Sequence, residues 1–141
     1  VTTFLAGTGS AAPTVTVTAP ADGWTAGGNT FTVACEKACV VMVKSGETYT
    51  KLVAADSGDT HSFTATLADG DQIIVRLKGD VNGDGQINTA DFGQTKAAAL
   101  GNLALNELNI NCATVSGGES VRTADFGQIK AAALGNLTFN W

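Results

Sequence analysis

A run of acidic and amide side chains between Gly79 and Phe92, GDVNGDGQINTADF, has the residue types and the spacing needed to hold a metal cation. In a twelve-residue loop that starts at Asp80, alternate positions point inward, and a hard cation such as calcium needs several oxygen ligands from one short segment. Gly85 stands at loop position 6, where the chain turns sharply, and Asn88 at position 9 could hold a water molecule. The predicted calcium ligands are Asp80, Asn82, Asp84, Gln86 through its main-chain carbonyl, and Asp91.

The structural alternative is a solvated turn, but such a turn needs only two or three of these residues. Six positions in register, with the apolar Ile87 at position 8, favour the metal loop. The preceding segment, QIIVRLKG at 72–79, is typical of a strand followed by a turn. The sequence therefore predicts a metal loop that leads into a helix, without the entering helix of a complete EF-hand.

The last three residues of the loop and the segment that follows them are repeated almost without change later in the chain. TADFGQTKAAALGNL at 89–103 returns as TADFGQIKAAALGNL at 123–137, and the two copies differ only at Thr95 and Ile129. The period of 34 residues (123 − 89) does not indicate a solenoid, because a solenoid needs at least three repeats to bury a continuous core. We expect a pair of loop–helix units, with Gly101 and Gly135 ending the helices. Helical periodicity places one apolar face on each helix, and we expect the two faces to pack against each other: Phe92, Thr95, Ala99 and Leu103, and in the copy Phe126, Ile129, Ala133 and Leu137.

The loop of the second copy is much poorer in ligands. Counting back from Asp125 at position 12 places Thr114, Ser116 and Gly118 at positions 1, 3 and 5. Since the number of carboxylates sets the affinity of such loops, we expect a very weak or empty site, with Ser116 and Asp125 as its ligands if it binds at all. The alternative is a metal-free turn that only positions the second helix, and this interpretation is preferred.

The first loop and the two loop–helix copies near the end of the chain resemble a dockerin, the module that attaches enzymes and scaffold proteins to cohesin modules. The resemblance covers about residues 78–141. It implies a small, calcium-dependent, all-α module of two antiparallel helices, secreted by a bacterium that builds extracellular multi-enzyme complexes. The implied function is protein binding without catalysis.

In this family, cohesin contacts come mostly from loop positions 10 and 11 and from the helix about six to eleven residues further on. The resemblance therefore implies these partner-binding residues: Thr89, Ala90, Lys96, Ala97 and Gly101, and in the copy Thr123, Ala124, Lys130, Ala131 and Gly135. The chain has Thr-Ala where the best-known dockerin group has Ser-Thr, so the resemblance does not indicate the class of cohesin.

Residues 13–77 have the pattern of an all-β domain. Six short segments rich in Thr and Val are separated by turns with Gly, Asp and Pro, which predicts a small antiparallel sandwich of immunoglobulin-like type. In position this region resembles the X modules that precede dockerins, and residues 1–12 are interpreted as a linker or tail. The predicted fold class is thus two modules, an N-terminal all-β immunoglobulin-like sandwich (13–77) and a C-terminal all-α dockerin (78–141).

Cys35 and Cys39 end one predicted strand and begin the next, so across a tight hairpin they could form a disulfide. The alternative is two small buried hydrophobic side chains. Cys112 has no predicted partner and is expected to be a buried apolar residue.

Several classes of function find no support in the composition. The net charge of −5 does not favour nucleic acid or anionic membranes, and the longest apolar run is too short to span a bilayer. No catalytic set of residues is evident, and His61 is expected at the surface, so we expect no enzyme activity. We interpret the chain as a fragment of a longer extracellular protein, in which carbohydrate would contact only an absent neighbouring module.

The alternative function is an extracellular carbohydrate-binding or adhesin segment in which calcium is purely structural. Trp24 and Tyr49 could then stack on sugars, although scattered aromatic residues in a sandwich more often pack in the core.

Overall fold

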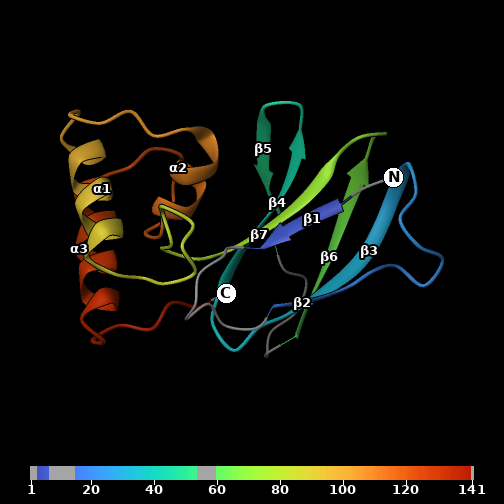
Figure 1. Cartoon of the computed structure of the whole chain (residues 1–141), viewed down its shortest axis with the longest axis horizontal. Helices are drawn as coiled ribbons and strands as arrows, with labels where there is room; N and C mark the ends of the chain where they lie inside the picture. The colour runs from blue at the N-terminus through green and yellow to red at the C-terminus, as the bar shows by residue number, and fades with distance from the viewer. Residues whose placement is uncertain (1–2, 7–14, 54–59, 141) are drawn as a thin grey trace.

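Two β-sheets packed face to face make up one side of the molecule, and three helices make up the other (Figure 1). The structure is a computed structural model that describes residues 3–6, 15–53 and 60–140. Its strands are β1 (Thr3–Ala6), β2 (Thr16–Thr18), β3 (Gly27–Ala34), β4 (Cys39–Ser45), β5 (Thr48–Lys51), β6 (Thr60–Leu67) and β7 (Gln72–Leu77). Its helices are α1 (Thr89–Ala99), α2 (Glu107–Ala113) and α3 (Thr123–Ala133).

The strands are arranged in the orders β1-β7-β4-β5 and β2-β3-β6. Among the described residues the paired strands are antiparallel except β1 and β7, which run parallel with Thr3 opposite Gln72. This pair corrects the interpretation of residues 1–12 as a linker or tail, because residues 3–6 are an edge strand of the sheet. The six strands predicted between 13 and 78 lie within a few residues of β2 to β7.

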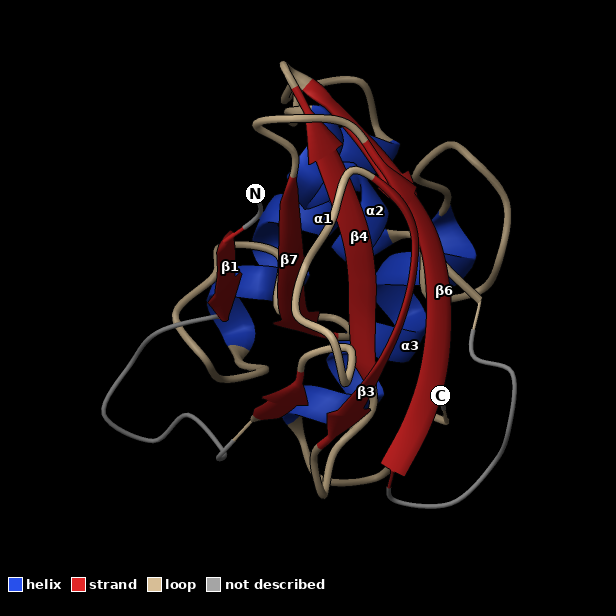
Figure 2. Cartoon of the chain, turned by 90° about the vertical axis from the view of Figure 1, so that its right-hand side faces the viewer, coloured by secondary structure: helices blue, strands red, loops and turns tan. Residues whose placement is uncertain are grey.

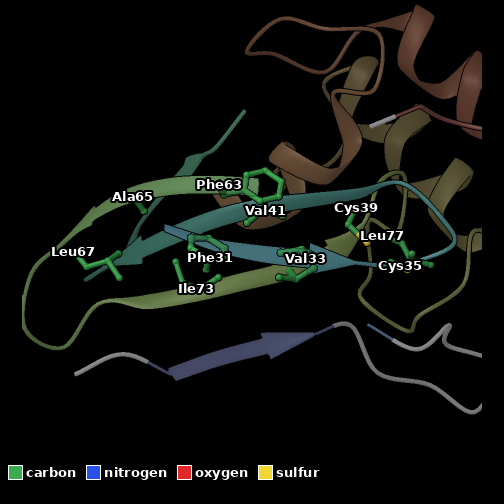
Figure 3. Packing of buried hydrophobic residues seen from close by; sticks show 11 residues of the cluster. Phe31, Val33, Cys35, Cys39, Val41, Phe63, Ala65, Leu67, Ile73 and Leu77 are labelled. Atoms are coloured by element: carbon green, nitrogen blue, oxygen red, sulfur yellow. The ribbon is translucent and has the colours of Figure 1, made fainter. Parts of the chain in front are cut away.

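The core between the two sheets is built by alternate side chains of facing strands. Phe31 and Val33 of β3 and Phe63 of β6 pack with Val41 of β4 in this core (Figure 3). Val75 of β7 belongs to the same cluster, and each of these five side chains is at most 2% exposed. The rings of Phe31 and Phe63 stack with centroids 5.7 Å apart. Period-two alternation directs these residues to one face of each strand, and burial of their apolar surface stabilises the sandwich.

The four-stranded sheet β1-β7-β4-β5, called the first sheet below, is also buried on the face that points away from the second sheet. The molecule is therefore more than a two-sheet sandwich. Met42 of β4 and Ile74 of β7 point away from the sandwich core and pack against Cys112 of α2, and at most 5% of each side chain is exposed. Asn111 of α2 also donates a hydrogen bond from Nδ2 to the main-chain oxygen of Tyr49 in β5, 3.0 Å away. The molecule therefore has three layers, sheet, sheet and helices, with the helices behind the strands in Figure 2.

The prediction of two separate modules, an immunoglobulin-like sandwich followed by an all-α dockerin, is wrong. The described part of the chain is mostly β-sheet with three short helices, and the predicted boundary at residue 78 runs through a packed region. Leu77 belongs to the sandwich core, and two residues later the Gly79 N–H donates to the Cys112 carbonyl at 3.0 Å. Helix α2, which the sequence analysis missed, covers the sheet and makes the two regions continuous.

The cysteine prediction also needs correction, because Cys35, Cys39 and Cys112 are all free thiols in this structure. All three are buried, as expected of small hydrophobic side chains. Burial raises the pKa of Cys112 to about 12, and burial together with the neighbouring Cys35 raises the pKa of Cys39. Because thiolates rather than thiols react, Cys39 and Cys112 should be unreactive in the folded protein.

Candidate metal centre

Three carboxylates of the first loop converge on one point. One oxygen from each of Asp80, Asp84 and Asp91 lies within 4.8 Å of the others, which makes a group able to hold a metal ion. Asp80 and Asp91 are fully buried, while Asp84 is half-buried. In the described part of the chain this is the one acidic group with that geometry.

The Asp80 carboxylate is held by main-chain N–H groups of its own loop. Its Oδ1 accepts from Gly83 at 3.0 Å and from Asp84 at 3.2 Å, and its Oδ2 accepts from Gly85 at 2.9 Å. Gly85, at loop position 6, has a φ of +85°, a conformation that side chains with a Cβ rarely adopt. The loop is thus folded around the carboxylate of its first predicted ligand.

The last carboxylate of the loop also starts the following helix. Asp91 accepts from the N–H of Asn82 at 3.1 Å through Oδ1 and from the N–H of Asn88 at 2.9 Å through Oδ2. Asn88 caps α1 by accepting from the Ala90 N–H at 3.1 Å. This reciprocal capping arrangement fixes the helix start to the loop, so the metal group and the orientation of α1 are coupled.

The electrostatics of the loop favour a bound cation. Burial raises the pKa of Asp80 to about 7, and the neighbouring carboxylates of Asp91 and Asp84 add to this shift, although the Gly85 N–H opposes it. Burial also raises the pKa of Asp91 against the hydrogen bonds from Asn88 and Asn82. For Asp84, hydrogen bonds from Gln86 and Asn88 outweigh desolvation and lower the pKa. A cation between the three groups would relieve the repulsion and favour all three charges.

The other loop residues expected to face the cation are less buried than Asp80 and Asp91, and each hydrogen-bonds to Asp84. Asn82 is exposed and its Oδ1 accepts from the Asp84 N–H at 3.2 Å. Gln86 is exposed too, and its N–H donates to Asp84 Oδ1 at 3.0 Å. Asn88, the position-9 residue, donates from Nδ2 to Asp84 Oδ2 at 3.0 Å.

An arginine of the preceding strand connects the first loop to helix α2 by hydrogen bonds. Arg76 of β7 donates from Nη1 to the Val81 carbonyl at 3.1 Å and to Asn109 Oδ1 of α2 at 2.7 Å. The guanidinium lies so close to Gly83 that a Cβ there would be 2.8 Å from its central carbon. This contact could not be predicted from the sequence, because Arg76 precedes the loop in a strand and only the packing of β7 against α2 directs its side chain to the loop.

The second loop holds its two predicted ligands together without an acidic cluster. Asp125 is fully buried, and its Oδ1 accepts from the Ser116 hydroxyl at 2.6 Å and from the Ser116 N–H at 2.9 Å. Val115 and Val121 of this loop pack in one apolar cluster with Val81 and Ile87 of the first. The two loops therefore share a core.

The predicted partner-binding residues lie on or near the surface. Eight of the ten are exposed, and Ala97 and Ala131 are half-buried. Of the predicted inward faces, Thr95 and Ile129 are fully buried as expected, but Leu103 and Leu137 are 40% and 38% exposed, because they lie beyond the ends of the two helices. Gly101 and Gly135 both have a φ of +80° directly after a helix, as predicted for C-terminal caps. One partner candidate is engaged within the chain: the Lys130 ammonium lies 5.5 Å from the centroid of the Phe92 ring.

The two aromatic residues considered for sugar binding pack on buried clusters and do not form a flat exposed platform. Trp24 packs on the sandwich core with its ring centroid 5.2 Å from that of Phe31, and Tyr49 packs on the cluster around Met42. His61, expected at the surface, is 2% exposed. None of the helices in the described residues is long and apolar enough to cross a membrane.

Comparisons of the chain with models of protein families, with curated proteins and with solved structures found no match.

Proposed function

We propose that this chain is a non-catalytic binding protein whose helical region docks onto a cohesin when calcium occupies the first loop. Docking would attach a secreted polysaccharide-degrading enzyme or a scaffold protein to a bacterial extracellular multi-enzyme complex. The partner class comes from the resemblance of residues 78–141 to dockerins. The observation that carries the proposal is the direct connection of a three-carboxylate group to a repeated, exposed helix surface.

Calcium is the metal that best suits the loop chemistry. The converging side chains offer only oxygen atoms, which are the ligands of calcium and magnesium, whereas zinc sites usually contain Cys or His. The loop places its ligands at the alternating positions of a twelve-residue calcium loop, with a positive-φ glycine at position 6. Calcium tolerates irregular geometry better than magnesium, which favours it in a loop whose side chains also hydrogen-bond to the main chain.

The link from metal to partner runs through the start of α1. Asp91 belongs to the metal group and also accepts from the N–H of the helix cap Asn88, while Thr89 and Ala90 of the proposed surface follow directly. Removal of the cation leaves the carboxylates to repel one another, and the helix start loses its fixed orientation. Partner binding should therefore depend on calcium although the ion touches no partner.

The test is calorimetric titration of the full chain with purified cohesin modules in calcium and in excess chelator. We expect binding to at least one cohesin in calcium and a loss of affinity on the order of 100-fold in chelator. Asp84→Ala should reproduce the effect of the chelator, while Glu119→Ala, which removes an exposed acidic residue of the second loop, should not. Binding that is equally strong in chelator would refute the proposal. So would glycan binding by a chain that recognises no cohesin, which would favour a structural role for calcium.

A further inference from the structure

The second loop, residues 114–125, has the same hydrogen-bond framework around its closing carboxylate as the first. Asp125 accepts from the N–H of Ser116 at 2.9 Å and from the N–H of Arg122 at 2.7 Å. These are loop positions 3 and 9, the two positions whose N–H groups bind Asp91 in the first loop. The second loop is thus closed in the same way, and its helix starts at the same point.

The groups that would hold a cation in the second loop are absent from their positions. Thr114 and Gly118 stand at positions 1 and 5, so Asp125 is the sole carboxylate at a carboxylate-bearing position of this loop. The main chain differs too: positive φ occurs at positions 4 and 5, Gly117 (+92°) and Gly118 (+97°), rather than at positions 4 and 6 as in the first loop. This donor set and backbone do not fit a calcium ion.

Two cationic side chains of the protein are bound to the loop instead. Arg122, at position 9, donates from Nη2 to the Gly117 carbonyl at 2.7 Å and to the Ser116 hydroxyl at 3.2 Å. Its guanidinium also lies over position 5, because a Cβ on Gly118 would be 3.4 Å from Nη2. Lys51 of β5 donates from Nζ to the hydroxyl of Thr114, the position-1 residue, at 2.8 Å. Positions 1, 3, 4 and 5 of this loop thus each lie beside a cationic side chain of the protein itself, Lys51 at position 1 and the exposed Arg122 at the other three.

We propose that Arg122, assisted by Lys51, replaces the metal ion in the second loop and makes that loop independent of calcium. From position 9 the guanidinium reaches back to two oxygen atoms at positions 3 and 4, those of Ser116 and Gly117, and charge-assisted hydrogen bonds of this kind are stronger than neutral ones. Because Asp125 is bound to Ser116, which in turn accepts from Arg122, the same network fixes the start of α3. The two repeats would then differ in their response to metal: chelation releases the start of α1 and leaves the start of α3 in place.

The first arm of the test uses the unmodified full chain. Calorimetric titration with calcium should give one ion per chain. Amide exchange in chelator should rise by about 100-fold or more at Gly83, Gly85 and Asn88, and by less than about threefold at Ser116 and Arg122. A second calcium ion, or an equal loss of protection in both loops, would overturn the proposal. Uptake of no calcium at all would instead refute the proposed function of the first loop, and Ser116 and Arg122 would still be expected to stay protected.

The second arm changes the arginine in calcium-saturated protein. Arg122→Ala should raise amide exchange at Ser116 by about tenfold or more, with little change at Gly85 and no change in calcium stoichiometry. Arg122→Lys retains the charge but not the fork of donors, so it should give an intermediate effect. Glu119→Gln, a charge change at an exposed residue of the same loop, is the matched control. Unchanged exchange at Ser116 in Arg122→Ala would show that the arginine does not hold the loop.

Discussion

At the residue scale, Asp80 combines complete burial with three main-chain hydrogen bonds and two neighbouring carboxylates. Its pKa of about 7 in the metal-free protein means that near neutral pH the loop holds a proton or needs a cation. Metal and proton therefore compete for the same group, and the pH dependence of stability should change sign with calcium.

The first prediction concerns that change of sign. The folded pKa of Asp80 lies above its ordinary value of 3.8, so the metal-free folded protein binds more protons than the unfolded chain between about pH 4 and pH 7. The free energy of unfolding in chelator should then fall as pH rises through this window, and the raised pKa of Asp91 acts in the same direction. With calcium bound the carboxylates must be ionised, so stability should rise with pH.

Thermal unfolding at pH 5 and pH 7.5, in chelator and in calcium, checks this prediction. We expect the metal-free protein to unfold at a higher temperature at pH 5 and the calcium-loaded protein at pH 7.5. Asp80→Asn cannot titrate and should reduce the pH dependence in chelator, whatever its effect on absolute stability. The same direction of pH dependence in both conditions would be inconsistent with the described electrostatics.

At the element scale, α1 and α3 carry the same surface in different surroundings. Apart from the buried pair Thr95 and Ile129 the two segments are identical. The rings of Phe92 and Phe126 pack against each other in a T-shaped arrangement, with centroids 5.9 Å apart and an interplanar angle of 85°. The apolar positions of the two loops also form one cluster. A partner could thus find the same chemistry on either helix.

The second prediction follows from this repetition. Ala97→Arg and Ala131→Arg each insert a long charged side chain into one of the two proposed docking surfaces. If a cohesin accepts either helix, each single variant should keep affinity within about threefold, and the double variant should lose more than about 100-fold. Calorimetry with the cohesin identified for the unmodified chain measures this. Loss of binding in one single variant alone would show that the interface uses one helix and that the repeat serves folding.

The third prediction concerns the contact between β7 and the first loop. Arg76→Ala removes the hydrogen bonds to Val81 and Asn109 while the calcium ligands stay unchanged. We expect calcium affinity to fall about tenfold. Without these hydrogen bonds the loop backbone is less ordered before binding, so part of the binding free energy is spent on ordering it. Lys37→Ala, at an exposed position of the β3–β4 turn, should leave affinity unchanged. An unaltered affinity in Arg76→Ala would mean that the loop is self-sufficient.

At the scale of the whole molecule, the first sheet is the shared layer. One face packs on the second sheet through residues such as Val41 and Val75, and the other packs on α2 through Met42 and Ile74. Lys51 and Arg76 extend this contact to both loops. Since the sheet contributes to two cores at once, its unfolding should expose both.

The fourth prediction is that the chain unfolds as one cooperative unit. Differential scanning calorimetry in calcium should show a single transition. Met42→Ala, which opens a cavity between β4 and α2, should lower the free energy of unfolding by about 3 kcal/mol without separating that transition into two. Leu100→Ala, at a side chain that is 57% exposed, is the control and should cost less than about 1 kcal/mol. Two transitions, of which Met42→Ala shifts only one, would show that the β-sheet region and the helical region unfold independently.

Short-range features of this protein could be predicted from the sequence because their determinants lie within a few residues of each other. The metal group spans Asp80 to Asp91, and its spacing alone identified the three converging carboxylates. The inward orientation of Thr95 and Ile129 follows from helical periodicity, and the strands follow from alternation bounded by turns. Each of these depends on local backbone geometry, which the sequence specifies directly.

The architecture and the support of the two loops depended on contacts between distant segments. In β7 the adjacent residues Ile73, Ile74 and Val75 are all buried, a pattern of a strand covered on both faces, but the sequence does not say what covers it. That role falls to α2, more than thirty residues later, and its packing directs Arg76 to the first loop and Lys51 to the second. Such contacts result from the competition of many apolar surfaces for burial, so the tertiary structure alone decided that the predicted modules are one folded unit.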